Sequence, residues 1–415
     1  MKKLGLTSKI FIGLISGAIL GIILNNIGAS YFKDTILVGG IFELMGQIFL
    51  RAIKMMVVPL VFVSIVNGAA SISDIRKLGR VGSKTILFYI LTTTIAISLA
   101  IGLGFLINPG VGLDMSQIDK IEPTIGESKP LVQVFYEMVP TNPIKSFTEG
   151  AMLQIIVFAM LVGVGLAYLG DKVKGLIGIF EQLNELVMKI VDFVMLIAPY
   201  GVFALIAKTF ASLGFEAMGY LLKYMITVIL ALLIHGTLTY SGLLVVFTKL
   251  NPIRFIKKLM PAMGVAFSTA SSSATIPVTL ETIEKDIGAS KSIASFTIPL
   301  GATINMDGTA IMQGVATVFI SQIYGVDLSI QAILTVIMTA TLASIGTAGV
   351  PGVGLIMLSM VLQAVNIPVE GIALIIGIDR ILDMARTAIN ITGDSVCTTI
   401  VCKTEGEFDE EVFNS

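Results

Sequence analysis

The sequence predicts an all-α protein that crosses a membrane many times. More than half of the 415 residues, 55%, are hydrophobic and only 13% are charged, and the mean hydropathy is +0.93. Charge-free apolar runs recur at the length of a bilayer-spanning helix, about 20 residues. These observations exclude a soluble domain, which would need a far more polar surface.

Net charge and the scarcity of reactive residues exclude further classes. The net charge is −1, so no basic surface indicates nucleic-acid binding. Cys397 and Cys402 are the only cysteines; they form no disulfide framework or CxxC motif, and we expect them to be small packing residues. A metal centre or a serine hydrolase would have to rely on His235, the only histidine. We expect His235 to be a helix residue that faces a polar gap.

Apolar runs predict the membrane helices in order. The first, at about 8–28, is interpreted as an uncleaved helix because further spans follow it. The next runs cover about 41–73, Thr85–Leu113, 151–170, 175–218 and Tyr224–Thr248. The number of crossings between 151 and 218 stays open, because a few charges interrupt these runs.

Lysine and arginine predict the orientation, because cytoplasmic loops carry them in excess. Lys2, Lys3 and Lys9 place the N-terminus in the cytoplasm, whereas the mostly acidic loop Asp114–Glu149 is placed outside. We expect a multi-pass protein of the inner cell membrane with both termini in the cytoplasm. The acidic residues at 404–415 predict a disordered tail.

Two later segments cannot be continuous helices. The charge-free run Leu328–Val369 is about twice as long as one span needs, and Gly and Pro interrupt its centre. Leu259–Leu280 has a similar polar centre that ends in Ile276-Pro277. Both predict re-entrant helical hairpins, because irregular backbone at membrane depth must be buried or line a cavity. Such a pair indicates an internal repeat and a transport site.

The last apolar segment carries five ionisable residues, each costing about 2.5–3.5 kcal/mol at a bilayer centre. They are Asp379, Arg380, Asp383, Arg386 and Asp394. Four of these and Asn390 fall within an arc of about 80° at ~100° per helical residue. This polar stripe must therefore face the protein interior, where we expect a binding site.

At these residues the chain resembles the glutamate/aspartate transporter family, the dicarboxylate/amino acid:cation symporters. The resemblance rests on Ser271–Ser273, the NMDGT motif Asn305–Thr309, the SIGTAGVP run Ser344–Pro351 and the run Asp379–Asp394. Together, in this order, they are specific, and the resemblance covers nearly the whole chain. It implies an all-α polytopic membrane protein with eight transmembrane helices, two re-entrant hairpins, inverted repeats, a homotrimer and an elevator motion. The ranges it implies are scaffold helices at 1–73 and 130–218, transport helices at 82–113, 219–250, 291–325 and 370–403, and hairpins at 252–285 and 328–368.

Arg386 and Asp383 indicate the substrate. A guanidinium can bind a side-chain carboxylate bidentately, and a carboxylate one helical turn away can accept from an α-ammonium. The alternative is an internal i,i+3 ion pair, which we favour less because a buried pair contributes little net stability. By resemblance, dicarboxylate relatives lack the acid and neutral amino acid relatives lack the Arg. We therefore expect aspartate and/or glutamate as substrate.

The family pocket maps onto a defined set of residues. By resemblance, the substrate-binding residues are Arg386, Asp383, Thr387, Asn390, Thr309, Ser271, Ser272, Val350 and Gly354. Relatives carry an additional Arg just before the triple serine or beside the Asp of the last helix. Ala270 and Met384 occupy those positions here, so the preference between aspartate and glutamate stays open.

Co-transported sodium ions are the cations we expect, since hard cations prefer oxygen ligands. By resemblance, three sites use Gly301, Asn305, Asn390 and Asp394; Thr303, Ser344, Ile345 and Thr347; and Tyr89, Thr92, Thr93, Asn305 and Asp307. For Thr92 and Thr93, hydroxyls that bond to the preceding helical turn are the alternative. Proton-coupled relatives tend to have Glu in the first hairpin tip and Asn at position 394, unlike Ala274 and Asp394 here. This difference favours sodium.

Other functions stay open at this point. An intramembrane serine hydrolase at Ser271–Ser273 would need His235 as its base and lacks a GxSxG elbow. An anion channel can coexist with transport in this family. A proton-coupled, neutral amino acid, cystine or dicarboxylate carrier is the nearest alternative.

Overall fold

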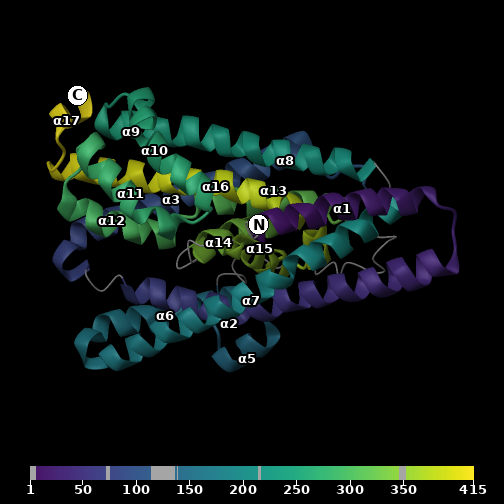
Figure 1. Ribbon diagram of the computed structural model, residues 1–415. Helices are drawn as coiled ribbons and strands as arrows, with labels where there is room; N and C mark the ends of the chain where they lie inside the picture. Colours follow the sequence, from purple (N-terminus) through teal and green to yellow (C-terminus); the bar gives the residue numbers. More distant parts are fainter. Residues whose placement is uncertain (1–5, 72–74, 114–135, 138, 214–215, 345–351) are drawn as a thin grey trace, which may run out of the picture.

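The computed structural model describes residues 6–71, 75–113, 136–137, 139–213, 216–344 and 352–415 (Figure 1). Within these residues every regular element is a helix, and one isolated bridge joins Ala289 to Phe408. The predicted all-α class is therefore confirmed. Four described stretches are long and apolar enough to span a membrane, namely Phe32–Asn67, Val81–Ile107, Gln154–Val194 and Met218–Thr248, and shorter apolar helices accompany them. The fold is that of a multi-pass membrane protein.

The N-terminal half consists of long helices. Its elements are α1 (Leu6–Asn26), the π-helix η1 (Phe32–Phe42), α2 (Glu43–Ser71), α3 (Ile75–Ile107), α5 (Pro143–Glu149), α6 (Met152–Leu169), the 3-10 turn η3 (Gly170–Val173) and α7 (Lys174–Leu213). α7 packs along both α1 and α2, and α6 packs on α2. In Figure 1, α2, α6 and α7 run together along the lower side of the molecule. Separate helices α6 and α7 therefore occupy the region where hydropathy left the number of crossings open.

The C-terminal half consists mostly of shorter, interrupted helices. Its elements are α8 (Glu216–Ile234), the π-helix η4 (His235–Tyr240), α9 (Ser241–Thr248), α10 (Pro252–Thr269), α11 (Ser272–Thr282), the π-helix η5 (Ile283–Ile287), α12 (Lys291–Ile304), α13 (Asp307–Ile323), α14 (Ile330–Ser344), α15 (Val353–Ala364), the 3-10 turn η6 (Val369–Gly371), α16 (Ile372–Glu405) and α17 (Glu410–Asn414). Most of these elements pack on α16, which runs through their centre (Figure 1).

Two pairs of helices double back on themselves. α10 ends at Thr269, Ala270 adopts a left-handed φ of 49°, and α11 begins at Ser272 with Ser271 as its N-cap. The two-residue connection joins the helices as a hairpin, and they pack on each other. α14 and α15 also pack together, but most of the segment between them lies outside the described residues.

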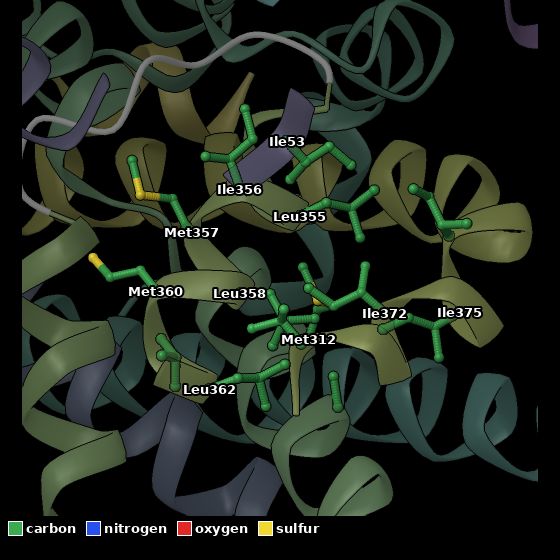
Figure 2. Packing of buried hydrophobic residues seen from close by; sticks show 14 of the residues in the cluster. Ile53, Met312, Leu355, Ile356, Met357, Leu358, Met360, Leu362, Ile372 and Ile375 are labelled. Carbon is green, nitrogen blue, oxygen red and sulfur yellow. The ribbon is translucent and has the colours of Figure 1, made fainter. Parts of the chain in front are cut away.

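α13 and α15 form the interior of the molecule. Every residue of α15 from Val353 to Leu362 is buried, and so is nearly all of α13. Figure 2 shows Met312 of α13, Leu355 and Leu358 of α15 and Ile372 of α16 in one apolar cluster. A helix that is hydrophobic and buried all round belongs at a protein core. This core places the start of α13 against the polar stripe of α16.

The tail beyond α16 is ordered, so the expectation of disorder at 404–415 is wrong. Residues Glu410–Asn414 form α17, capped by the side chain of Asp409. Phe413 is buried, and Lys258 of α10 lies over its ring and donates to the carbonyl of Val412. One apolar anchor and several hydrogen bonds outweigh the acidic composition on which the expectation rested.

Candidate functional site

The polar stripe of α16 faces inward, as predicted. Asp379, Asp383, Asn390 and Asp394 are buried, and Arg386 is fully buried. Helical spacing gathers these residues on one face, and that face meets α13 and the neighbouring helices rather than lipid.

Arg386 is held by two carboxylates of its own helix. Its Nη1 donates to Oδ1 of Asp379 at 2.6 Å, and its Nη2 donates to Oδ2 of Asp379 at 3.3 Å and to Oδ1 of Asp383 at 2.9 Å. Asp383 also accepts from Nη1 of Arg380 at 3.4 Å. The internal pair between Asp383 and Arg386 is therefore present. Asp379 and Arg380, to which the sequence assigned no role, belong to the same cluster.

One donor of the guanidinium remains without a partner among the described residues. Within the described residues Nε of Arg386 is buried without a hydrogen-bond partner. A guanidinium presents two forks: Nη1 with Nη2, engaged by Asp379, and Nε with Nη2. The second fork holds only one oxygen, from Asp383. An orphaned buried donor costs about 1–3 kcal/mol, so this fork is suited to an incoming oxygen anion.

Small residues allow other helices to approach Arg386. A Cβ at Gly308, in the first turn of α13, would lie 2.6 Å from the carbonyl oxygen of Arg386. A Cβ at Gly354 of α15 would lie 3.4 Å from Nη2 of Arg386 and 3.4 Å from the methyl group of Thr309. Gly354 therefore lies beside the guanidinium and Thr309 lies beside Gly354, and both belong to the substrate-binding set that the resemblance implies.

A break in one helical run creates a second polar cluster. α12 ends at Ile304, Asn305 is extended (φ −93°, ψ 92°), and α13 begins at Asp307. The amide nitrogen of Asn305 donates to Oδ1 of Asp394 at 2.8 Å and to the carbonyl of Asn390 at 3.2 Å. Oδ1 of Asn390 accepts from the N–H of Gly308 at 2.8 Å. The side-chain oxygen of Asn305 has no partner within the described residues.

Gly301 lies beside this cluster. A Cβ there would collide with the carboxylate of Asp394 and with the hydroxyl of Tyr89, at 2.6 Å. The carbonyl of Gly301 accepts the backbone N–H of Asn305. The structure thus brings together Gly301, Asn305, Asn390 and Asp394, which is the first predicted cation set.

A third cluster surrounds Asp307, whose carboxylate is fully buried. Oδ1 accepts from the hydroxyl of Thr93 at 2.5 Å. Oδ2 accepts from the hydroxyl of Tyr240 at 2.7 Å and lies 3.1 Å from Nε2 of His235. Thr93 and Asp307, two members of the third cation set that the resemblance implies, are therefore in direct contact.

Other predicted residues have different partners or lie outside the described residues. The hydroxyls of Thr92, Thr303, Ser344 and Thr387 bond to carbonyls of their own helices, at Tyr89, Leu300, Thr341 and Asp383. Tyr89 donates to the carbonyl of Thr297. Ser271 caps α11 through Ala274, and Ser272 is buried. Ile345, Thr347 and Val350 lie outside the described residues.

Sequence reasoning gives no role to Asp379 or Tyr240 and only a minor one to His235. Asp379 carried a signal, because it lies seven residues before Arg386 on the same helical face. For His235 the sequence predicts only that it faces a polar gap. Tyr240 carried no signal, because its approach to Asp307 depends on the π-helical turn.

The contacts of His235 also bear on the alternatives of a serine hydrolase and a metal centre. Its Nε2 lies against Asp307, while the hydroxyl of Ser271 caps α11, so each of the two residues has a structural partner of its own. No group of three His, Cys, Asp or Glu suited to a metal ion occurs in that part of the chain. Cys397 and Cys402 are free and buried, as expected.

Comparison with known proteins identifies the family. The model of the sodium:dicarboxylate symporter family matches residues 6–404. The chain is 39% identical to the proton/sodium-glutamate symport protein of Bacillus caldotenax, covering 99% of this chain and 97% of that protein. It is 38% identical to the proton/glutamate-aspartate symporter of Escherichia coli strain K12, covering 99% and 95%. It is 34% identical to the C4-dicarboxylate transport protein of Bacillus subtilis strain 168, covering 98% and 94%. The chain belongs to the sodium:dicarboxylate symporter family and is a membrane transporter, not an enzyme.

Proposed function

We propose that this protein is a sodium-coupled symporter that imports an acidic amino acid, aspartate and/or glutamate. The observation that carries the proposal is the half-open guanidinium fork of Arg386. Nε and Nη2 form a planar pair of donors, and a side-chain carboxylate of the substrate matches that pair bidentately. Asp379 holds the opposite fork and keeps the guanidinium in place.

Charge balance supports an amino acid over a simple dicarboxylate. When a substrate carboxylate takes the Nε–Nη2 fork, it displaces Oδ1 of Asp383 from Nη2. Asp383 then keeps only its longer contact with Arg380, and a new cationic partner is favourable because a weakly compensated buried charge is destabilising. The α-ammonium group supplies that charge at a residue one turn from Arg386. The exchange returns a second cation to Asp383, whereas a dicarboxylate would leave it with Arg380 alone.

The oxygen clusters support cation coupling. Asp394 and Asp307 are buried carboxylates, and within the described residues their hydrogen bonds come from amide, hydroxyl and imidazole groups rather than from Lys or Arg. A bound cation would neutralise each carboxylate, and the free side-chain oxygen of Asn305 adds a ligand that hard cations prefer. We assign sodium to these places, with Asp394, Asn305, Asn390 and Gly301 at one site and Asp307, Asn305 and Thr93 at another.

The architecture belongs to the same proposal. Helices at 1–73 and 130–218 form a static scaffold of a homotrimer in the inner membrane, with both termini in the cytoplasm. The remaining helices and the two hairpins carry the substrate across by an elevator motion. The support is the family membership and the interrupted helices at the site.

The test is uptake of radiolabelled aspartate into proteoliposomes that contain the purified protein. We expect uptake to require an inward sodium gradient and to proceed without a pH gradient. Equal uptake driven by a proton gradient in sodium-free buffer would reject sodium coupling. Competition by glutamate, serine, cystine and succinate defines the substrate, and stronger competition by serine or succinate than by glutamate would reject the acidic amino acid.

A further inference from the structure

A π-helical turn brings two side chains onto the same carboxylate. His235 and Tyr240 are the first and last residues of η4. In an α-helix, residues five apart point about 140° away from each other. The wider π-turn, with its i→i+5 pattern, places them near one face. Their rings lie 4.6 Å apart in an edge-to-face arrangement, and both contact Oδ2 of Asp307.

The two oxygens of Asp307 are therefore used differently. Oδ2 is engaged by Tyr240 and His235, both from η4, whereas Oδ1 accepts, among the described residues, from the hydroxyl of Thr93 on α3 alone. All four residues are essentially inaccessible to solvent. A carboxylate with one oxygen fixed in this way cannot rotate about its terminal bond without losing two hydrogen bonds. Its other oxygen is thus held in one direction.

The hydroxyl of Tyr240 also reaches toward the Asn305 cluster. A Cβ at Gly393 of α16 would collide with that hydroxyl and with the amide nitrogen of Asn305. The absence of a side chain at Gly393 therefore lets Tyr240 and Asn305 converge over the surface of α16. The hydroxyl of Tyr240 therefore bonds to Asp307 and lies near Asn305, which in turn bonds to Asp394.

We propose that Tyr240 and His235 are positioning residues for the transported cation. They hold Oδ2 of Asp307 so that Oδ1, with Thr93, is presented to sodium in a fixed direction. This inference rests on the proposed function, because it takes Asp307 as a cation ligand. Outer-sphere hydrogen bonds of this kind orient metal ligands, and their loss typically costs about 10–100-fold in metal affinity.

The contacts suggest a different role for each donor. Tyr240 makes the shorter bond and can act only as a donor to a carboxylate. Nδ1 of His235 has no partner within the described residues, so Nε2 is the atom through which this ring acts. Glutamine can place an N–H near the position of Nε2, whereas leucine cannot. The pair of substitutions therefore separates the hydrogen bond of His235 from the space that its ring fills.

The experiment measures the sodium concentration that gives half-maximal aspartate uptake in proteoliposomes. We expect Tyr240→Phe and His235→Leu to raise it about tenfold, with the maximal rate recovered at saturating sodium, and His235→Gln to lie near the unsubstituted protein. Tyr224→Phe is the matched control. Tyr224 is equally buried on α8, and its hydroxyl has no hydrogen-bond partner in the described part of the chain.

Further measurements separate the possible failures. If Tyr240→Phe lowers only the thermal unfolding temperature and leaves the sodium dependence unchanged, the positioning role is rejected and Tyr240 is structural. Tyr240→Phe decides the outcome should His235→Leu fail to fold, because it removes a single oxygen atom. Asp307→Asn should raise the sodium concentration for half-maximal uptake, whatever the roles of Tyr240 and His235. Unchanged sodium dependence in Asp307→Asn, or sodium-independent uptake by the unsubstituted protein, would instead refute the proposed function on which this inference rests.

Discussion

Asp379 holds Arg386 across two turns of α16, with Oδ1 2.6 Å from Nη1 and Oδ2 3.3 Å from Nη2. Seven residues span about 10.5 Å along a helix. The long arginine side chain covers this distance because side chains in helices lean toward the N-terminus. The bond fixes the plane of the guanidinium and thereby the direction of its open fork.

Replacing Asp379 by Asn should therefore weaken substrate binding as well as stability. We expect the dissociation constant for aspartate to rise about 10–100-fold, since the guanidinium loses its anchor. Breaking a buried ion pair costs about 3–5 kcal/mol, and Asp383 should keep the loss near the lower value. Calorimetric titration and thermal unfolding in detergent measure the two effects. Asp192→Asn, which removes an exposed pair with Lys189, should change neither. Unaltered aspartate affinity in Asp379→Asn would reduce Asp379 to a structural role.

Arg386→Lys tests the fork rather than the charge. Lysine keeps the positive charge and can pair with Asp379, but it offers a point charge in place of the planar Nε–Nη2 pair. We expect aspartate affinity to fall at least about 100-fold, measured by competition against radiolabelled uptake. Arg386→Cys should abolish acidic substrates and admit serine. Undiminished aspartate binding in either variant would remove Arg386 from the substrate site.

Some of this site could be predicted from sequence, because periodicity reports which residues share a face. Charges at helical spacing had to turn inward, and Asp383, Arg386 and Asp394 are indeed buried. The partner of Arg386 could not be ranked, because Asp379 and Asp383 are both within its reach. The contact of Tyr240 depends on a local π-turn for which apolar periodicity carries no signal.

The interruption of a helix and the packing of a chain terminus are equally hard to predict from composition. Asn305 interrupts the run 291–325, which the resemblance predicts to be one helix. The break, at Asn305 and Met306, contains neither Gly nor Pro. The acidic composition of the tail predicts disorder, because composition does not weigh the single apolar anchor, Phe413. Long-range contacts decide both outcomes, and they are absent from a single sequence.

Gly308→Ala should disturb the contact between α13 and α16. The new Cβ would lie 2.6 Å from the carbonyl oxygen and 2.9 Å from Cα of Arg386, and backbone cannot yield as a flexible side chain can. We expect a loss of about 1–3 kcal/mol in the free energy of unfolding, with weaker aspartate binding because Arg386 shifts. Gly242→Ala in α9 is the control, since its Cβ meets open space. Equal stability of both variants would contradict the close approach.

The C-terminal tail is joined to the loop before α12 by several bonds. The carboxylate of Glu407 accepts from the hydroxyls of Ser290 and Ser292 at 2.6 and 2.9 Å, and its carbonyl accepts from the N–H of Ser290. The N–H of Asp409 donates to Gly288. The hydroxyl donors favour the ionised carboxylate and therefore lower the pKa of Glu407 from its ordinary value of 4.5.

Docking of the tail should consequently weaken in acid. Because the pKa of Glu407 is depressed in the docked state, its contribution is fully present above about pH 4.5 and is lost as the pH falls through the lower, docked value. A fluorophore attached at Ser415→Cys reports docking, since Ser415 is exposed and both native cysteines are buried. We expect its anisotropy to fall as the pH is lowered below the ordinary pKa of 4.5.

Glu407→Gln separates this carboxylate from the other acids of the tail. The amide still accepts hydrogen bonds but does not titrate, so the variant should show lower anisotropy at neutral pH and a smaller change in acid. Phe413→Ala, which removes the buried anchor, should release the tail at every pH. An acid transition of the same size in Glu407→Gln would assign the pH dependence to another group, because the serine hydroxyls themselves do not ionise in this range.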